Sequence, residues 1–193
     1  MNAEQAKLKN IIDAAFGFSA MTRVFEKEST EKIINKLNET LAQLITLKNE
    51  KEFEDLHASF CRWFVRKVKT AERAKRDGTK KPSTPTSYGQ GAKVLDVALK
   101  VYVYYCHLPD VNTAERITKW LKAAIDTNMM KYLKNSAKKT ELSFDATSIE
   151  DVRDIETYTK LQALVQKDIE LRLPARTVPV QWDDIMWRKL NNK

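Results

Sequence analysis

Glycine and proline are scarce in this sequence, and their scarcity limits the folds that the chain can adopt. The 193 residues include only 4 Gly and 5 Pro, the residues that most often form tight turns. An all-β domain needs many such turns, whereas a helical domain needs few. With 42% hydrophobic and 31% charged residues, the composition is typical of a globular protein. The sequence therefore predicts few, long elements, which favours helices.

Apolar residues recur at helical spacing along most of the chain. The stretch at about 88–107 is apolar on most of its circumference, which indicates a helix at the centre of the domain. Its run VYVYY could also form a strand, but the apolar pattern extends upstream through Ala98, Leu95 and Val94. We therefore expect an all-α fold of six to seven helices packed around this central helix. The other helices are expected at about residues 3–16, 29–48, 51–76, 112–134, 148–171 and 182–190.

One segment breaks the helical pattern. The sequence GTKKPSTPTS, residues 78–87, contains two prolines and a cluster of turn-forming residues. We interpret it as a flexible, basic loop inside a single domain that covers residues 1–193, because the chain has the length of one ordinary domain.

The sequence also predicts a compartment. Two cysteines provide no disulfide framework. The first residues lack the apolar run of a signal peptide, and no stretch reaches the roughly 18 apolar residues of a membrane span. We therefore expect a cytoplasmic protein that does not contact a membrane. The sequence does not predict its oligomeric state.

Positive charge is concentrated in one short window. The chain has a net charge of +8, and residues 62–81 alone contain nine Lys or Arg against two Asp or Glu. If the helix at 51–76 is continuous, five of these cations lie in a ribbon about 80° wide, opposite Phe53, Phe60 and Phe64. The ribbon consists of Arg62, Arg66, Lys69, Arg73 and Arg76, and Lys80 and Lys81 extend it.

This ribbon leads to the main functional prediction. Like charges spaced three or four residues apart destabilise a helix unless something else compensates. Arg also matches phosphate geometry well. We predict a non-enzymatic protein that binds DNA or RNA through phosphate contacts, largely independently of sequence. Two alternatives remain open: the ribbon is an ordinary solvated helix face, or it binds an acidic protein partner.

All histidines and cysteines of the chain fall in two pairs. His57 and Cys61 are spaced i,i+4, a spacing that metal ligands on a helix use, and Cys106 and His107 are adjacent. If the two helices pack together, the four residues could form a zinc site. However, no Cys-x-x-Cys motif is present, and buried cysteine is more often a packing residue. We therefore expect core packing, with no metal and no cofactor.

A polar stripe on the central helix and an acidic pair near the end offer weak catalytic candidates. The stripe contains Lys93, Asp96, Lys100, Tyr104 and His107. His107, Asp96 and Tyr104 are residue types used in acid–base chemistry, and paired acids such as Asp183 and Asp184 can bind magnesium. These residues keep open the alternative of a nucleic-acid-cleaving enzyme or toxin. The simpler interpretations are a solvent-facing edge for the stripe and a helix cap for the acids.

Overall fold

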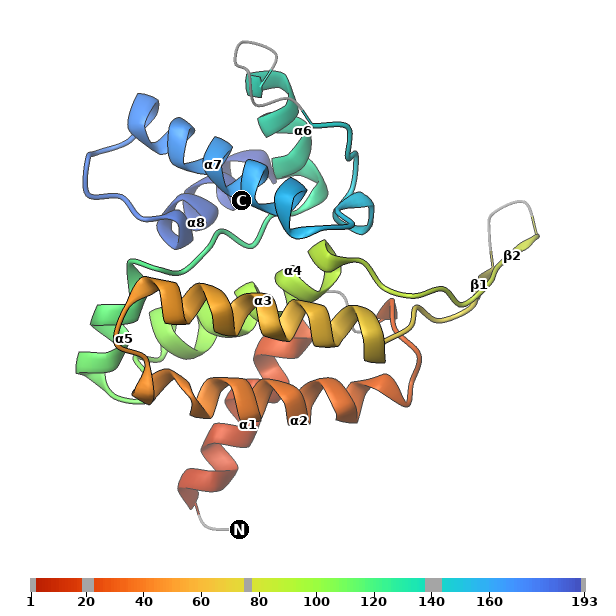
Figure 1. The fold of residues 1–193 in the computed structure, drawn as a ribbon, viewed down its shortest axis with the longest axis horizontal. Helices are drawn as coiled ribbons and strands as arrows, with labels where there is room; N and C mark the ends of the chain where they lie inside the picture. The colour runs from red at the N-terminus through yellow and green to blue at the C-terminus, as the bar shows by residue number, and fades with distance from the viewer. Residues whose placement is uncertain (1–2, 19–22, 75–77, 138–143, 192–193) are drawn as a thin grey trace.

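The fold consists of two groups of helices and a narrow arm (Figure 1). The computed structural model describes residues 3–18, 23–74, 78–137 and 144–191. These residues form eight α-helices and one pair of two-residue strands, which confirms the predicted all-α fold. The lower group in Figure 1 holds α1 (Ala3–Phe18), α2 (Ser29–Ala42), α3 (Glu50–Lys67), α4 (Tyr88–Leu99) and α5 (Val111–Thr118). The upper group holds α6 (Thr127–Ala137), α7 (Ile155–Arg172) and α8 (Pro179–Leu190).

Helix α4 is the central element, as the sequence predicts. It contacts α1, α2, α3 and α7. A capping box begins the helix, because Ser87 Oγ accepts from Gln90 N at 3.1 Å and Gln90 Oε1 accepts from Ser87 N at 2.9 Å. A Cβ atom on Gly91 would lie 2.9 Å from Cβ of Phe64. Glycine at this position therefore allows α3 to approach α4 closely.

The run VYVYY continues α4 as a helix and is not a strand. Residues Lys100–Tyr105 form a π-helical segment, η3, in which Cys106 N donates to Val101 O at 3.0 Å. His107, two residues after this segment, has a φ of 53°, which lies in the left-handed region. The predicted central helix is therefore correct, but its last turn is wider than an α-helix.

Helix α3 ends nine residues before the predicted end, and this corrects the predicted ribbon. Its last residue is Lys67, and Val68 is already extended, with φ −114° and ψ 136°. Val68 and Thr70 are buried while Lys69 is exposed, which is the two-residue period of extended chain. Backbone hydrogen bonds hold this extended piece between two other segments: Ala71 N donates to Val24 O at 2.8 Å, and Thr70 N to Thr84 O at 2.8 Å.

The arm follows this extended piece. Strand β1 (Arg73–Ala74) pairs antiparallel with β2 (Lys80–Lys81), with Arg73 opposite Lys81. Figure 1 shows the arm extending away from both helix groups. Part of the predicted 78–87 loop thus pairs with residues 70–74, while its flexibility and the single-domain boundary stay predictions. Arg76 lies outside the described residues.

Two further helices differ from their predicted bounds. The helix expected at 112–134 is split into α5 and α6, and the residues between them cross from the lower to the upper group. Asp110 caps α5 by accepting from Thr113 N at 3.0 Å. The helix expected at 148–171 begins with a single 3-10 turn, η4 (Ile149–Asp151), and α7 then starts after the cap Asp154. Another 3-10 turn, η2 (Leu44–Thr46), follows α2.

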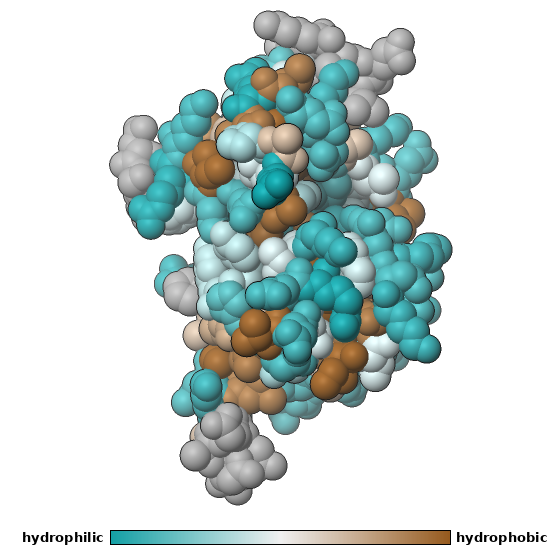
Figure 2. Space-filling model, turned by 90° about the vertical axis from the view of Figure 1, so that its left-hand side faces the viewer, coloured by the Kyte–Doolittle hydropathy of each residue, from teal (hydrophilic) through white to brown (hydrophobic). Residues whose placement is uncertain are grey.

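The surface opposite the arm is mainly hydrophilic. Figure 2 shows hydrophobic residues there as several separate areas among hydrophilic ones, an ordinary pattern for a protein surface. Over the whole described surface, the large exposed apolar side chains are Leu8, Ile45, Tyr105, Val111, Ile155, Leu171, Ile185 and Trp187. Within the described ranges, no helix has the length and apolar character that a bilayer span requires.

Candidate functional site

Four exposed cations surround the C-terminal end of α3. Arg62, Arg66 and Lys67 belong to the helix, and Lys69 follows it. We call these four residues the cationic end of α3. Among the residues that the structure describes, none of the four side chains forms an ion pair. Arg62 and Arg66 are spaced i,i+4 and lie on one face, as predicted, but Lys69 and Arg73 lie in the extended chain after the helix and do not continue this helical face.

Two lysines in the described part of the arm have acidic partners. Lys80 Nζ lies 2.8 Å from Glu72 Oε1, and Lys81 Nζ lies 3.3 Å from Glu150 Oε1. Arg73 donates from Nη2 to the backbone oxygen of Arg23 at 3.3 Å, and its charge has no acidic partner among the described residues. The cationic end of α3 thus carries more uncompensated charge than the arm.

The charges of α3 are distributed unevenly along the helix. Glu50 and Glu52 lie in the first turn, and Arg66 and Lys67 lie in the last turn. The helix dipole favours acidic residues near the N-terminus of a helix and basic residues near its C-terminus. The dipole therefore stabilises Arg66 and Lys67 where they are, but it leaves their guanidinium and ammonium groups free to contact a solvent-borne anion.

A fully buried polar cluster links α3, α4 and α7. His57 Nε2 lies 2.9 Å from Asp96 Oδ1, and Tyr158 donates its hydroxyl to Asp96 Oδ2 at 2.8 Å. Cys61 Sγ lies 3.7 Å from His57 Nδ1, and the rings of His57 and Tyr158 stack with centroids 5.3 Å apart. We call these four residues the His57 cluster. Asp96 is therefore not on a solvent edge, as the sequence suggested, but at the centre of the protein.

The His57 cluster has the order of groups found in cysteine nucleophile sites, with a thiol, an imidazole and a carboxylate in sequence. However, Cys61 is 0% exposed and His57 is 4% exposed. The space beside His57 between Phe53 and Leu95 does not admit a water molecule. A substrate therefore cannot reach the thiol in this conformation.

The charge state of His57 predicts how stability depends on pH. Burial alone would lower its pKa, but the neighbouring Cys61 and Asp96 raise the pKa from 6.5 to about 10. Because the folded pKa is above the unfolded one, this contribution to stability is complete below pH 6.5 and is lost as the pH rises through about 10. We expect the free energy of unfolding, measured with urea, to fall across this range. His57→Gln should flatten the profile, whereas Tyr158→Phe should keep it; a profile that is unchanged in His57→Gln would contradict this prediction.

Asp183 and Asp184 do not cap a helix, so the interpretation of the two acids as a helix cap is wrong. Helix α8 begins at Pro179, and Gln181 Oε1 accepts from Val178 N at 3.1 Å, so the two acids lie in its second turn. Lys100 Nζ lies 2.9 Å from Asp183 Oδ2 and 2.6 Å from Asp184 Oδ1. We call these three residues the Lys100 triad.

Asp96 and Lys100 of the polar stripe therefore lie at the interface between the two helix groups, where they bond to α7 and α8. Burial raises the pKa of Asp183 to about 6, although Lys100 opposes this shift. Burial also lowers the pKa of Lys93, with Asp126 and Asp183 opposing. The acids are paired with lysines and hydrogen-bonded within the fold, so they are not arranged as a magnesium site. Tyr104 is half-buried and His107 is exposed, and neither is bonded to Asp96.

The two histidines and two cysteines of the chain are not arranged as a zinc site. Cys61 and His57 are buried, whereas Cys106 is exposed and His107 lies beside it at the end of η3. In the described part of the chain, no three His, Cys, Asp or Glu residues are grouped so that they could hold a metal ion.

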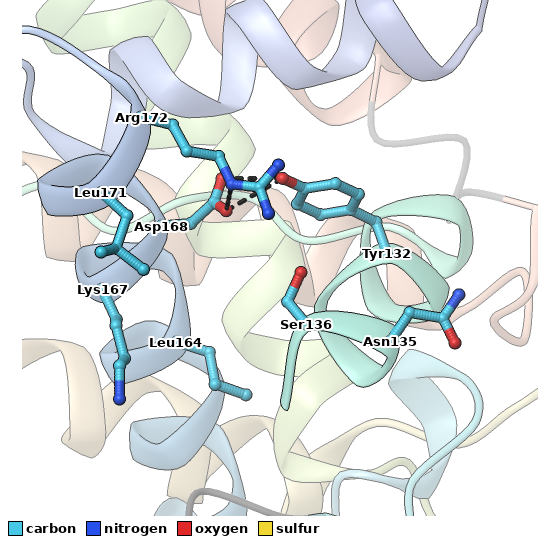
Figure 3. A pocket seen from close by; sticks show the side chains of 8 residues that line it. All are labelled: Tyr132, Asn135, Ser136, Leu164, Lys167, Asp168, Leu171 and Arg172. Carbon is cyan, nitrogen blue, oxygen red and sulfur yellow. Dashed lines mark hydrogen bonds and ion pairs between the residues drawn. The ribbon is translucent and has the colours of Figure 1, made fainter. Parts of the chain in front are cut away.

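A pocket of about 380 Å³ lies between α6 and α7 (Figure 3). Its carboxylate, Asp168, accepts from Tyr132 at 2.9 Å, from Trp182 Nε1 at 2.9 Å and from Arg172 Nε at 3.0 Å. Figure 3 shows that Tyr132, Asp168 and Arg172 point toward one another. The charges of Asp168 and Arg172 therefore compensate each other, and most of the remaining wall, including Leu164 and Leu171, is apolar.

Comparison of the chain with known protein families, curated proteins and solved structures finds no match. The sequence interpretation missed Lys67 of the cationic end, which is part of the same basic run. It also missed Arg153, for which the sequence offered no signal, because only the fold brings this residue next to the arm.

Proposed function

We propose that this protein binds nucleic acid, without enzymatic activity, through the cationic end of α3 and the adjoining arm. One observation supports this proposal: Arg62, Arg66, Lys67 and Lys69 are exposed, close together in the chain and without an ion pair among the described residues. Several other exposed lysines have acidic partners, such as Lys9 with Asp13, Lys51 with Asp55 and Lys160 with Glu156. Other exposed cations such as Arg176 and Arg188 also lack an ion pair among the described residues, but the cationic end combines four such residues within eight positions of the chain.

The expected mode of binding follows from the residue types. Arg and Lys match phosphate oxygens, which are the same whatever the base sequence. Binding should therefore depend on the backbone and not on base sequence. The two cysteines, which are free and of which Cys106 is exposed, support a reducing compartment such as the cytoplasm.

The experiment is a binding series against DNA and RNA at increasing salt. If the four cations of the cationic end each neutralise one phosphate, the logarithm of the association constant should fall with a slope of about −3.6 against the logarithm of salt concentration. An affinity that does not change with salt would contradict the proposal. Capture of an acidic protein that survives nuclease treatment, together with absent nucleic-acid binding, would favour the alternative partner.

Charge-reversal variants test whether the cationic end of α3 is the binding site. Arg66→Glu combined with Lys69→Glu should weaken nucleic-acid binding by roughly a hundredfold near 0.1 M salt, because each lost phosphate contact is worth about tenfold there. The matched control is Arg176→Glu with Arg188→Glu, two exposed arginines without ion pairs among the described residues. Fluorescence anisotropy with a labelled oligonucleotide measures the affinities. If both double variants lose the same affinity, the loss reflects net charge alone. The cationic end of α3 is then not the binding site.

A further inference from the structure

A second pocket lies where the arm joins the helices. It has a volume of about 330 Å³, at the lower end of the range of ligand pockets. The base of the arm, the start of α4 and the residues around η4 form its walls. We call it the arm-base pocket, and its polar lining residues are Thr70, Lys81, Thr84, Gln90, Glu150 and Arg153.

The charge of the arm-base pocket is positive by one unit. Lys81 is paired with Glu150, at 3.3 Å between Nζ and Oε1. Arg153 is exposed and has no ion pair within the described residues. One uncompensated guanidinium matches one monoanion, such as the phosphodiester that links two nucleotides.

Gln90 supplies a hydrogen-bond donor without a partner. Its side chain is almost completely buried, with 2% of the residue exposed. Oε1 accepts from Ser87 N at 2.9 Å, but in the described part of the chain the side-chain nitrogen donates to no atom. This nitrogen is not one of the fully buried polar atoms without a partner, so it can donate to water or to a ligand in the pocket. This amide thus favours a ligand that carries acceptors, as sugars and nucleobases do.

The side chains, and not the end of the helix, provide this site. Three of the first backbone N–H groups of α4 are already used: Gly89 N donates to Val152 O at 2.9 Å, and Gln90 N and Gly91 N both donate to Ser87. Thr70 and Thr84 hydroxyls lie 2.9 Å apart and add polar groups to the wall.

We propose that the arm-base pocket takes a single unpaired nucleotide of the strand that the cationic end of α3 holds, with its phosphodiester against Arg153 and its sugar or base against Gln90. This inference rests on the proposed nucleic-acid binding and adds a substrate class, namely nucleic acid that contains an unpaired nucleotide. A pocket of this volume has no room for a stacked base pair, so a perfect duplex can use the cationic end of α3 and the arm but not the pocket.

The test compares a perfect DNA duplex with the same duplex carrying one extra unpaired nucleotide. The protein should bind the bulged duplex roughly tenfold more tightly near 0.1 M salt, the value of about one phosphate contact. Arg153→Gln and Gln90→Glu should each remove this preference and keep the affinity for the perfect duplex. Gln90→Glu retains the oxygen that caps α4 but loses the donor, and Arg176→Gln is the control for lost charge.

The outcomes separate the two proposals. Equal affinity of the wild-type protein for both duplexes, or a preference that persists in Arg153→Gln, would overturn the role of the pocket and leave the proposed function standing. Binding of neither duplex would overturn both. Arg153 is exposed and makes no described ion pair, so its variant reports on the pocket even if Gln90→Glu fails to fold.

Discussion

Replacement of Asp96 with alanine should lower the free energy of unfolding by roughly 3–5 kcal/mol. Asp96 is 2% exposed and is the common partner of His57 and Tyr158. Its removal leaves a protonated imidazole and a phenol without their acceptor in the core, and water cannot reach them. Breaking one side of a buried charge pair is far more costly than losing a surface pair.

Urea unfolding at neutral pH measures this loss. The control is Asp55→Ala on the same helix as His57, because Asp55 pairs with the exposed Lys51 and should contribute little. Asp96→Asn keeps the shape and should be intermediate. A loss in Asp96→Ala that does not exceed the loss in Asp55→Ala would mean that His57 is neutral in the folded protein.

Replacement of Lys100 with methionine should cost roughly 3 kcal/mol at pH 8. Methionine keeps the apolar stem of Lys100 but leaves Asp183 and Asp184 adjacent and without their cation. Asp183 is 3% exposed, so its charge would be buried and unpaired. Its carboxyl already has a pKa raised to about 6 by burial, and without Lys100 the pKa should rise further.

The pH dependence of this variant makes the test specific. Ionised Asp183 destabilises the variant, so the deficit should be largest above pH 6 and should shrink as protonation removes the charge at lower pH. Lys100→Met combined with Asp183→Asn should recover most of the loss. The control, Lys160→Met, removes a lysine from an exposed pair with Glu156. A deficit that is the same at pH 5 and pH 8 would show that lost packing, and not the unpaired acid, is responsible.

The helical class, the central helix and the buried phenylalanine face of α3 could be predicted from periodicity. These features depend on local apolar patterns, which the sequence displays directly. The end of α3 could not be predicted in this way, because Val68–Thr70 becomes extended by pairing with residues 24–26 and 84–86. A β-branched residue on either side of Lys69 was the available signal, but the regular spacing of the cations obscured it.

The candidate site was predicted only in part. The sequence located the excess charge but assigned it to one continuous helix, whereas the structure distributes it over a helix end and an arm. It also assigned the polar residues of α4 to a solvent edge, since nothing local indicates that α7 and α8 cover Asp96 and Lys100. Partners that lie 39 to 83 residues apart in the chain can be recognised only in the folded protein.

The polar stripe on α4 has a consequence for cooperativity. Asp96 and Lys100 lie one helical turn apart and bond to α7 and α8, respectively. A shift of the upper helices by one turn would therefore place charges opposite the wrong partners. Separation of the two groups would also expose the apolar surface around these charges. The two helix groups therefore match in a single alignment. Each group stabilises the folded state of the other.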